Sequence, residues 1–173
     1  ELAHSYMALR YGVKIESITL FLFGGVSAME EMPRKPGQEA KMASVGPLTS
    51  LLIGFVCLFI YGNLIYPNPA LSQNPAYFTI WILGAMNLVL GIFNLLPAFP
   101  MDGGRVLRSF YARRMSYVKA TQSAAAVGKF FAILMAIFGI VVGNLWFPLI
   151  ALFIYVGASE EERSTRAEVT LEN

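Results

Sequence analysis

The chain has 173 residues, enough for one modest domain, and 56% of them are hydrophobic while only 14% are charged. Soluble domains carry about 25% charged residues, so this composition, with a mean hydropathy of +0.57, indicates a membrane protein. The formal net charge of +2 gives no reason to expect a nucleic-acid partner. Cys57 is the only cysteine, which excludes an internal disulfide and a cluster of thiolate metal ligands.

The first residues, ELAHSYMALR, are typical of the end of a helix that begins upstream. Residues 17–28, SITLFLFGGVSA, are rich in β-branched and aromatic residues and then reach a glycine pair. This composition predicts a short β element followed by a bend. Residues 29–41 are charged and contain proline and glycine, so they are predicted to form a loop.

A long charge-free stretch between Lys41 and Asp102 predicts two membrane spans. A helix of about 20 apolar residues crosses the hydrocarbon core, and residues 42–66 and 77–96 each supply one. Residues 67–76 hold three prolines and no charge, which predicts a short turn between the spans. A soluble fold is excluded, because an apolar stretch of this length is typical of transmembrane segments.

The second charge-free stretch lies between Lys129 and Glu160. Residues 124–158 predict either two helices with a turn near Gly143 or one long tilted span. The domain organisation follows as a membrane core over residues 1–158 and a polar cytoplasmic tail or linker after it. The expected fold class is an all-α polytopic membrane protein of about 4–5 transmembrane helices, one of them partial at the N-terminus, with a short β element.

Between the two stretches, the segment NLLPAFPMDGGR cannot continue a helix, because Pro97 and Pro100 remove backbone donors. Such a break inside a membrane requires protein or a cavity to satisfy the freed backbone groups. Residues 104–119 then predict a basic amphipathic helix. Asp102 is an ionisable residue at membrane depth, which is a functional-site hypothesis by default; the alternative is a helix N-cap.

Positive charge in short loops predicts the topology. Basic residues gather in residues 10–41 and 105–119, and the turn at 67–76 carries none. Two spans separate the basic segments, so both are predicted on the cytoplasmic side. His4 lies close to the first basic segment and Asp102 just before the second, which predicts that the two side chains lie at one depth near one face.

These two residues can supply part of a zinc site, because a catalytic zinc has three protein ligands and one open position. A histidine one position before Glu1 would complete the pattern H-E-x-x-H, with Glu1 as general base on the zinc-bound water. The chain begins at Glu1 and lacks that histidine, so the fragment alone is predicted to bind metal weakly. The alternatives are a structural or solvated His4 and a solvated Glu1 near a chain end.

Four pieces of the chain together resemble the site-2 protease family of intramembrane zinc metalloproteases. They are ELAH, the LFGG of residues 22–25, the Gly46-Pro47 element at the start of the next span, and NLLPAFPMDGGR. The last piece matches the family pattern N-x-x-P-x-x-P-x-D-G and is the most specific. The resemblance covers roughly residues 1–108, and the missing first histidine indicates truncation of a longer protein.

The resemblance implies roles for individual residues. Glu1 is implied as the general base, and His4 and Asp102 as zinc ligands. Asn94 is implied to bind the substrate backbone or to steady the oxyanion, the alternative being an interhelical hydrogen bond. The Gly24–Gly25 pair is implied to expose a strand edge to which an unwound substrate adds backbone hydrogen bonds, the alternative being an ordinary turn.

The implied function is hydrolysis of peptide bonds in or near transmembrane segments of membrane-protein substrates, with Zn²⁺ as cofactor. The implied setting is the lipid bilayer of a prokaryotic cell membrane, with the catalytic site toward the cytoplasm, no nucleic-acid partner and, in some members, a regulatory domain beyond the C-terminus. Two alternatives stay open. One is a non-catalytic, pseudoprotease-like module that binds client helices, and the other is a carrier with an acidic site at a broken helix.

Overall fold

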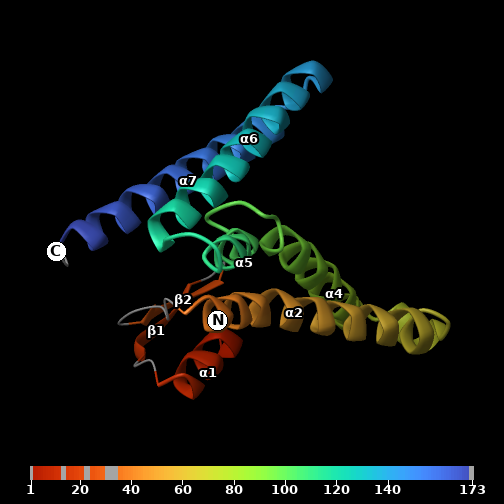
Figure 1. Cartoon of the computed structure of the whole chain (residues 1–173). Coiled ribbons are helices and arrows are strands. Elements are labelled where there is room, and N and C mark those ends of the chain that lie inside the picture. The colour runs from red at the N-terminus through yellow and green to blue at the C-terminus, as the bar shows by residue number, and fades with distance from the viewer. Residues whose placement is uncertain (1, 13–14, 22–23, 30–34, 172–173) are drawn as a thin grey trace.

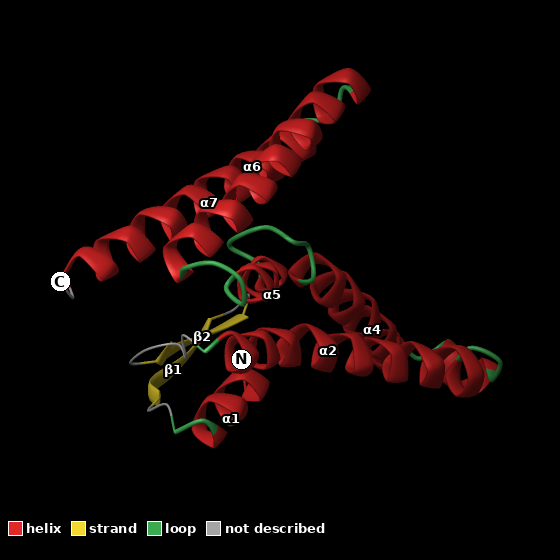
Figure 2. Ribbon diagram, viewed as in Figure 1, coloured by secondary structure: helices red, strands yellow, loops and turns green. Residues whose placement is uncertain are grey.

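The computed structural model describes residues 2–12, 15–21, 24–29 and 35–171. Within these ranges the chain is helical apart from one antiparallel β-hairpin (Figures 1 and 2). In chain order the elements are α1 (Leu2–Arg10), β1 (Ile15–Phe21), β2 (Gly24–Met29), α2 (Pro36–Ile60), the π-helical turn η1 (Tyr61–Ile65), α3 (Pro69–Ser72), α4 (Pro75–Asn94), α5 (Asp102–Tyr111), α6 (Tyr117–Val142) and α7 (Trp146–Leu171).

Three stretches, α2 with η1, α4, and α6, are long and apolar enough to cross a membrane. The prediction of a helical, multi-pass membrane protein is confirmed. The helices form two hairpins, because α2 packs on α4 and α6 packs on α7. The short helix α5 lies between the hairpins and contacts both α2 and α6, and the hairpins diverge from it (Figure 1).

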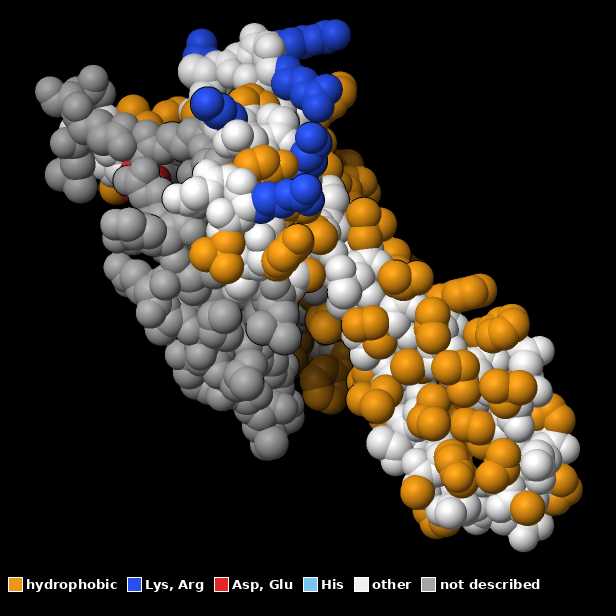
Figure 3. Space-filling model, turned by 90° about the horizontal axis from the view of Figure 1, so that it is seen from below, with side chains coloured by type: hydrophobic (Ala, Val, Ile, Leu, Met, Phe, Trp, Pro, Cys, Tyr) orange, Lys and Arg blue, Asp and Glu red, His pale blue; other side chains and the backbone are white. Residues whose placement is uncertain are grey.

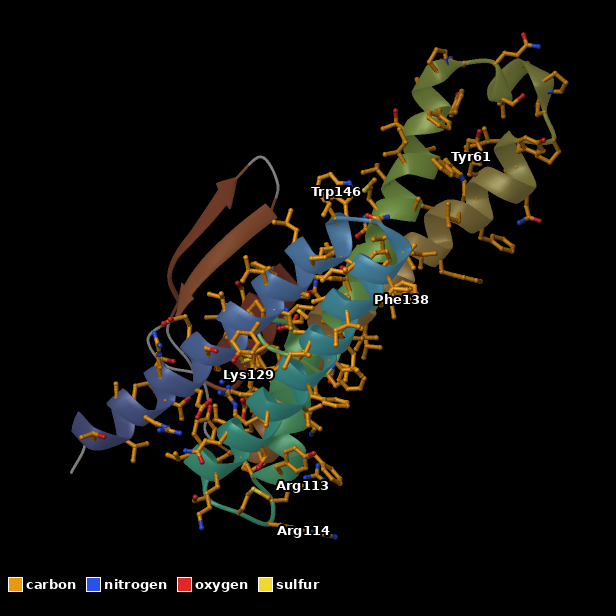
Figure 4. The ribbon with its side chains drawn as sticks, turned by 90° about the horizontal axis from the view of Figure 1, so that it is seen from above. Tyr61, Arg113, Arg114, Lys129, Phe138 and Trp146 are labelled. Atoms are coloured by element: carbon orange, nitrogen blue, oxygen red, sulfur yellow. The ribbon has the colours of Figure 1, made fainter. Side chains whose placement is uncertain are left out.

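Charged and apolar surfaces are separated along the molecule. Figure 4 places Arg113 and Arg114 at one end, while Tyr61 and Trp146, at the turns of the two hairpins, lie toward the other. In Figure 3 hydrophobic side chains cover the limb formed by the α2–α4 hairpin, and the Lys and Arg side chains gather at the opposite end of that face. This separation suits a protein whose hairpins enter the hydrocarbon core from one basic side.

Local sequence signals set the ends of the long helices. The side chain of Asn74 accepts a hydrogen bond from the backbone N–H of Ala76 at 3.0 Å and caps α4, which begins with a proline. Gly143 ends α6 with φ of +71°, a conformation that favours glycine. Asn144 then accepts from the backbone N–H of Trp146 at 3.0 Å. The stretch 124–158 therefore belongs to two helices rather than one span.

The polar residues after position 158 continue α7, which runs without interruption to Leu171. The amine of Lys129 on α6 donates to the carboxylate of Glu162 on α7 at 2.9 Å. Arg166 donates to the same carboxylate at 2.6 Å. The structure places the polar residues up to Leu171 in the second half of a helix that is held to α6.

The proline-broken segment between α4 and α5 contacts the second hairpin through its buried residues Ala98, Phe99 and Met101. Phe99 has no exposed surface and Ala98 is 3% exposed. A Cβ atom built on Gly157 of α7 would lie 2.5 Å from Pro100, so α7 approaches this loop closely. Short backbone hydrogen bonds within the loop, including one of 2.7 Å to the carbonyl of Leu96, satisfy groups that the prolines free.

Two boundaries differ from the sequence expectations. The helix α2 begins at Pro36 and not at residue 42, because a proline is well suited to the first turn, where the backbone N–H has no helical partner. The predicted helix over residues 104–119 is interrupted, since α5 ends at Tyr111 and α6 begins at Tyr117. Residues 36–41, which the sequence predicts as part of a loop, therefore belong to α2. Glu39 lies on the first turn of this helix.

Candidate active site

His4 projects from α1 onto α2, where its Nδ1 atom donates a hydrogen bond to the backbone carbonyl of Met42 at 2.8 Å. Because a carbonyl oxygen only accepts, Nδ1 carries a proton and Nε2 is left for another partner. Nε2 lies 3.3 Å from Oδ2 of Asp102. The fold thus brings together two side chains that are separated in the sequence by the β-hairpin and two complete membrane spans.

The backbone of α2 touches the imidazole directly at Gly46. A Cβ atom built on Gly46 would overlap Nε2 of His4 and lie 2.6 Å from Cε1 and 2.8 Å from Cδ2. Real Cβ atoms essentially never come so close to another heavy atom. A side chain at position 46 would therefore have to displace the His4 ring, which gives the Gly46-Pro47 element a physical role that the sequence alone does not reveal.

Asp102 is the first residue of α5, and Met101 occupies the N-cap position without a side-chain hydrogen bond to the helix. A carboxylate in the first turn interacts favourably with the helix dipole. The alternative in which Asp102 serves as the N-cap residue is therefore not what the structure shows. Its carboxylate is instead directed toward His4.

The two glycines after Asp102 hold the start of α5 against the preceding loop. A Cβ atom on Gly103 would overlap the carbonyl oxygens of Leu95 and Leu96, and one on Gly104 would lie 2.7 Å from the backbone of Ala98. This packing fixes where α5 begins. It therefore fixes the position of the Asp102 backbone relative to α4.

The pair has the electrostatic character of a cation site. A neutral imidazole that donates from Nδ1 presents a lone pair at Nε2, and a carboxylate oxygen also presents lone pairs, so the two atoms need a proton or a metal cation between them. Their separation of 3.3 Å is slightly beyond the usual range for a hydrogen bond from nitrogen to oxygen. Two tetrahedral zinc ligands with bonds of about 2.0–2.1 Å would lie about 3.3 Å apart.

The donor set therefore fits two of the ligands of a zinc ion. The side chains of His4 and Asp102 are 15% and 19% exposed, so the pair is enclosed but can still be reached. Among the described residues, which exclude Glu1, no three His, Cys, Asp or Glu side chains form a group that could hold a metal. A site with three protein ligands would need a third one from outside these residues.

The remaining predicted site residues are placed less completely. Glu1 lies outside the described residues. Asn94 is the last residue of α4 and is partly buried. Gly24 and Gly25 begin β2, where they pair with the end of β1. In the described part of the chain this sheet has two strands, so each strand has one outer edge.

One feature of the structure is not expected from the sequence, a buried ion pair between Arg108 and Glu39. The charge pattern assigns Arg108 to the basic residues that set the topology and Glu39 to a loop. In the structure these residues are 2% and 1% exposed, and they contact each other. The signal that could have revealed them is the start of α2 at Pro36, which puts Glu39 on the helical face that also carries Gly46.

Comparison with known proteins assigns the fold. A family model described as Peptidase family M50 matches residues 64–138, which include Asp102. The solved structure of the site-2 protease from Methanocaldococcus jannaschii superposes with a TM-score of 0.71 at 41% sequence identity, covering 93% of this chain and 71% of that chain. The chain belongs to the site-2 protease family.

Curated relatives of this site-2 protease chain extend well beyond it. A zinc metalloprotease of Methanocaldococcus jannaschii is 41% identical over 173 residues, which is 100% of this chain and 49% of that protein. The Rip3 protein of Mycobacterium tuberculosis is 38% identical over 174 residues, which is 94% of this chain and 42% of that protein. The chain thus spans about half the length of the curated relatives it matches. Like the family, it is an integral membrane protein.

Proposed function

We propose that the chain forms the core of an intramembrane zinc metalloprotease that hydrolyses peptide bonds in or near transmembrane segments of membrane proteins. The observation that supports this most directly is the separation of 3.3 Å between His4 Nε2 and Asp102 Oδ2. That value suits two ligands of one tetrahedral zinc ion. Family membership supports the reaction class, since a relative 41% identical to this chain is named a zinc metalloprotease.

The residues then divide the chemistry between them. His4 and Asp102 would hold the metal, and a histidine directly before Glu1 in the complete protein would supply a third ligand. When bound, zinc lowers the pKa of water to about 7 and polarises a carbonyl group. Glu1 would act as the general base that accepts a proton from water, and the hydrogen bond from His4 to Met42 would keep Nε2 free and oriented for the metal.

Two further features would handle the substrate. Gly24 and Gly25 offer backbone groups at the start of β2, where an unwound peptide can add as a strand. Asn94 would donate to the substrate backbone or to the oxyanion from the end of α4. A helical peptide bond is shielded by its own hydrogen bonds, so opening it is a prerequisite for attack. The active site would face the cytoplasmic side of a prokaryotic membrane.

The test uses the complete protein expressed with a library of epitope-tagged, single-span membrane proteins. A substrate is a membrane protein that is shortened when the wild type is expressed and stays intact when it is not, and we expect Glu1→Gln to leave it intact. That variant should keep its zinc, whereas His4→Ala and Asp102→Asn should lose both zinc and cleavage. Arg163→Met is a matched control, because its ion pair with Glu160 is on the exposed face of α7.

Three results would contradict the proposal. Shortening of a substrate by Glu1→Gln at the wild-type rate would remove the general-base mechanism. Zinc-free wild-type protein that retains client helices without cutting them would favour the pseudoprotease alternative. Ion-dependent transport by the purified protein in vesicles would favour the carrier.

A further inference from the structure

Arg108 on α5 is a buried cation held by two carboxylates from different helices. Its Nε atom donates to Oε1 of Glu39 on α2 at 2.7 Å, and its Nη1 atom donates to Oε1 of Glu161 on α7 at 2.6 Å. The side chain of Arg108 is 3% exposed and that of Glu39 is 1% exposed. A buried charge is costly unless it is paired. Arrangements in which the Arg108 guanidinium loses its carboxylate partners are therefore disfavoured.

Two aromatic rings complete the surroundings of the guanidinium. Its central carbon lies 5.2 Å from the ring centroid of Phe99 and 4.8 Å from that of Tyr117. Phe99 belongs to the loop before α5, and Tyr117 is the first residue of α6. Arg108 therefore joins α5 to both hairpins. A lysine cannot reproduce this arrangement, because a single ammonium lacks the planar fork that reaches two carboxylates.

The contact between α2 and α5 has two fixed points. At one end Arg108 meets Glu39, and at the other Asp102 meets His4, which is pressed against Gly46. Glu39 and Gly46 are seven residues apart, so they share one face of α2 about 10.5 Å apart along its axis. Asp102 and Arg108 are about 9 Å apart along α5. Each of the two helices therefore carries two contact points that are nearly two helical turns apart.

We propose that Arg108 is a positioning residue for the zinc site: it fixes the rotation and height of α5 on α2, and thereby the separation between Asp102 and His4. The inference rests on the proposed function, because it concerns the same metal. Arg108 does not touch the metal. Removing the Arg108 guanidinium breaks its contacts with Glu39 and Glu161, which lets α5 rotate or slide on α2. The Asp102 carboxylate then moves away from His4.

The test compares Arg108→Met, Arg108→Lys and the double variant Arg108→Met with Glu39→Leu in the complete purified protein. Zinc affinity is measured by competition with a chelator, and the ligand geometry by the absorption spectrum after loading with Co²⁺. Thermal unfolding of the metal-free protein is measured in parallel. Lys129→Met is the matched control, because it breaks an ion pair between α6 and α7 that does not involve α5.

The double variant separates positioning from stability, because it removes the buried carboxylate together with its cation. We expect it to unfold near the wild-type temperature while its zinc affinity falls about 10- to 100-fold, as for other groups that orient metal ligands. Arg108→Lys should show the same loss with a changed Co²⁺ spectrum, and Lys129→Met should bind zinc as the wild type does.

Wild-type zinc affinity and Co²⁺ spectrum in both the double variant and Arg108→Lys would overturn the inference and leave the proposed function intact. If the double variant does not fold, Arg108→Lys decides the question alone, since it retains the charge. A wild-type protein that binds no zinc would contradict the proposed function itself. The two failures are therefore distinguishable.

Discussion

Replacement of Gly46 by alanine should damage the site while leaving the helix intact. Gly46 lies inside α2, where alanine is favoured over glycine by about 1 kcal/mol. On propensity alone the substitution would stabilise the protein. Any loss of function would then come from the contact with His4, and not from loss of the helix.

The size of the displacement follows from the packing. The added Cβ would lie 2.6 Å from Cε1 of His4, and ordinary van der Waals contact begins at 3.4 Å, so the ring must retreat by about 0.8 Å or more. Moving the ring also breaks its hydrogen bond to Met42. Misplacement of a catalytic group by about 1 Å can cost about 100-fold in rate. We expect zinc affinity and cleavage to fall by about 10- to 100-fold.

The assay measures zinc affinity by chelator competition and cleavage of a tagged single-span substrate, with circular dichroism to follow helix content. Gly37→Ala is the control, because it makes the same change on the same helix where a Cβ atom meets nothing within 4 Å. Wild-type affinity and cleavage in Gly46→Ala would refute the reasoning. It would mean that His4 has room to move without cost to the site.

Three other predictions follow from the packing and the ion pairs. Gly103→Ala should reduce zinc affinity and the melting temperature together, because its Cβ would overlap the carbonyl oxygen of Leu96. Arg108→Met alone should destabilise the protein by about 3–5 kcal/mol, measured by denaturant unfolding, because it leaves a buried carboxylate unpaired. The hydrogen bond from Lys129 holds the pKa of Glu162 below its ordinary value of 4.5. The stabilisation from this ion pair is fully present above pH 4.5 and is lost as the pH falls through the lowered pKa that Glu162 has in the folded protein. The melting temperatures of the wild type and of Lys129→Met should therefore converge in acid.

Much of the architecture could be predicted from the distribution of charge. The long uncharged stretch between Lys41 and Asp102 indicates two spans, and the structure shows the corresponding hairpin. Basic residues in two segments indicate that His4 and Asp102 lie at one depth, and the structure shows them 3.3 Å apart. These inferences succeed because the bilayer separates apolar from charged segments by depth. The charge pattern of the sequence therefore indicates the depth of each segment.

Lateral packing could not be predicted in the same way. The pairing of Arg108 with Glu39 joins residues that are far apart in the sequence, and a charged residue near a membrane surface is ordinarily solvated. The requirement for glycine at position 46 depends on an imidazole supplied by another helix. Neither feature leaves a periodic pattern, so neither is visible without the relative placement of α1, α2 and α5.

The site therefore depends on more than its ligands. His4 and Asp102 come from two helices that meet on α2, and their separation is held by an imidazole pressed on Gly46, a glycine pair packed on the preceding loop, and the fork of Arg108. Loss of any one of these would leave both ligands in the sequence but move one of them relative to the other. A family member that retains both ligands but carries a side chain at position 46 is accordingly expected to bind zinc poorly. The identity of that residue would separate proteases from client-binding modules better than the ligands alone.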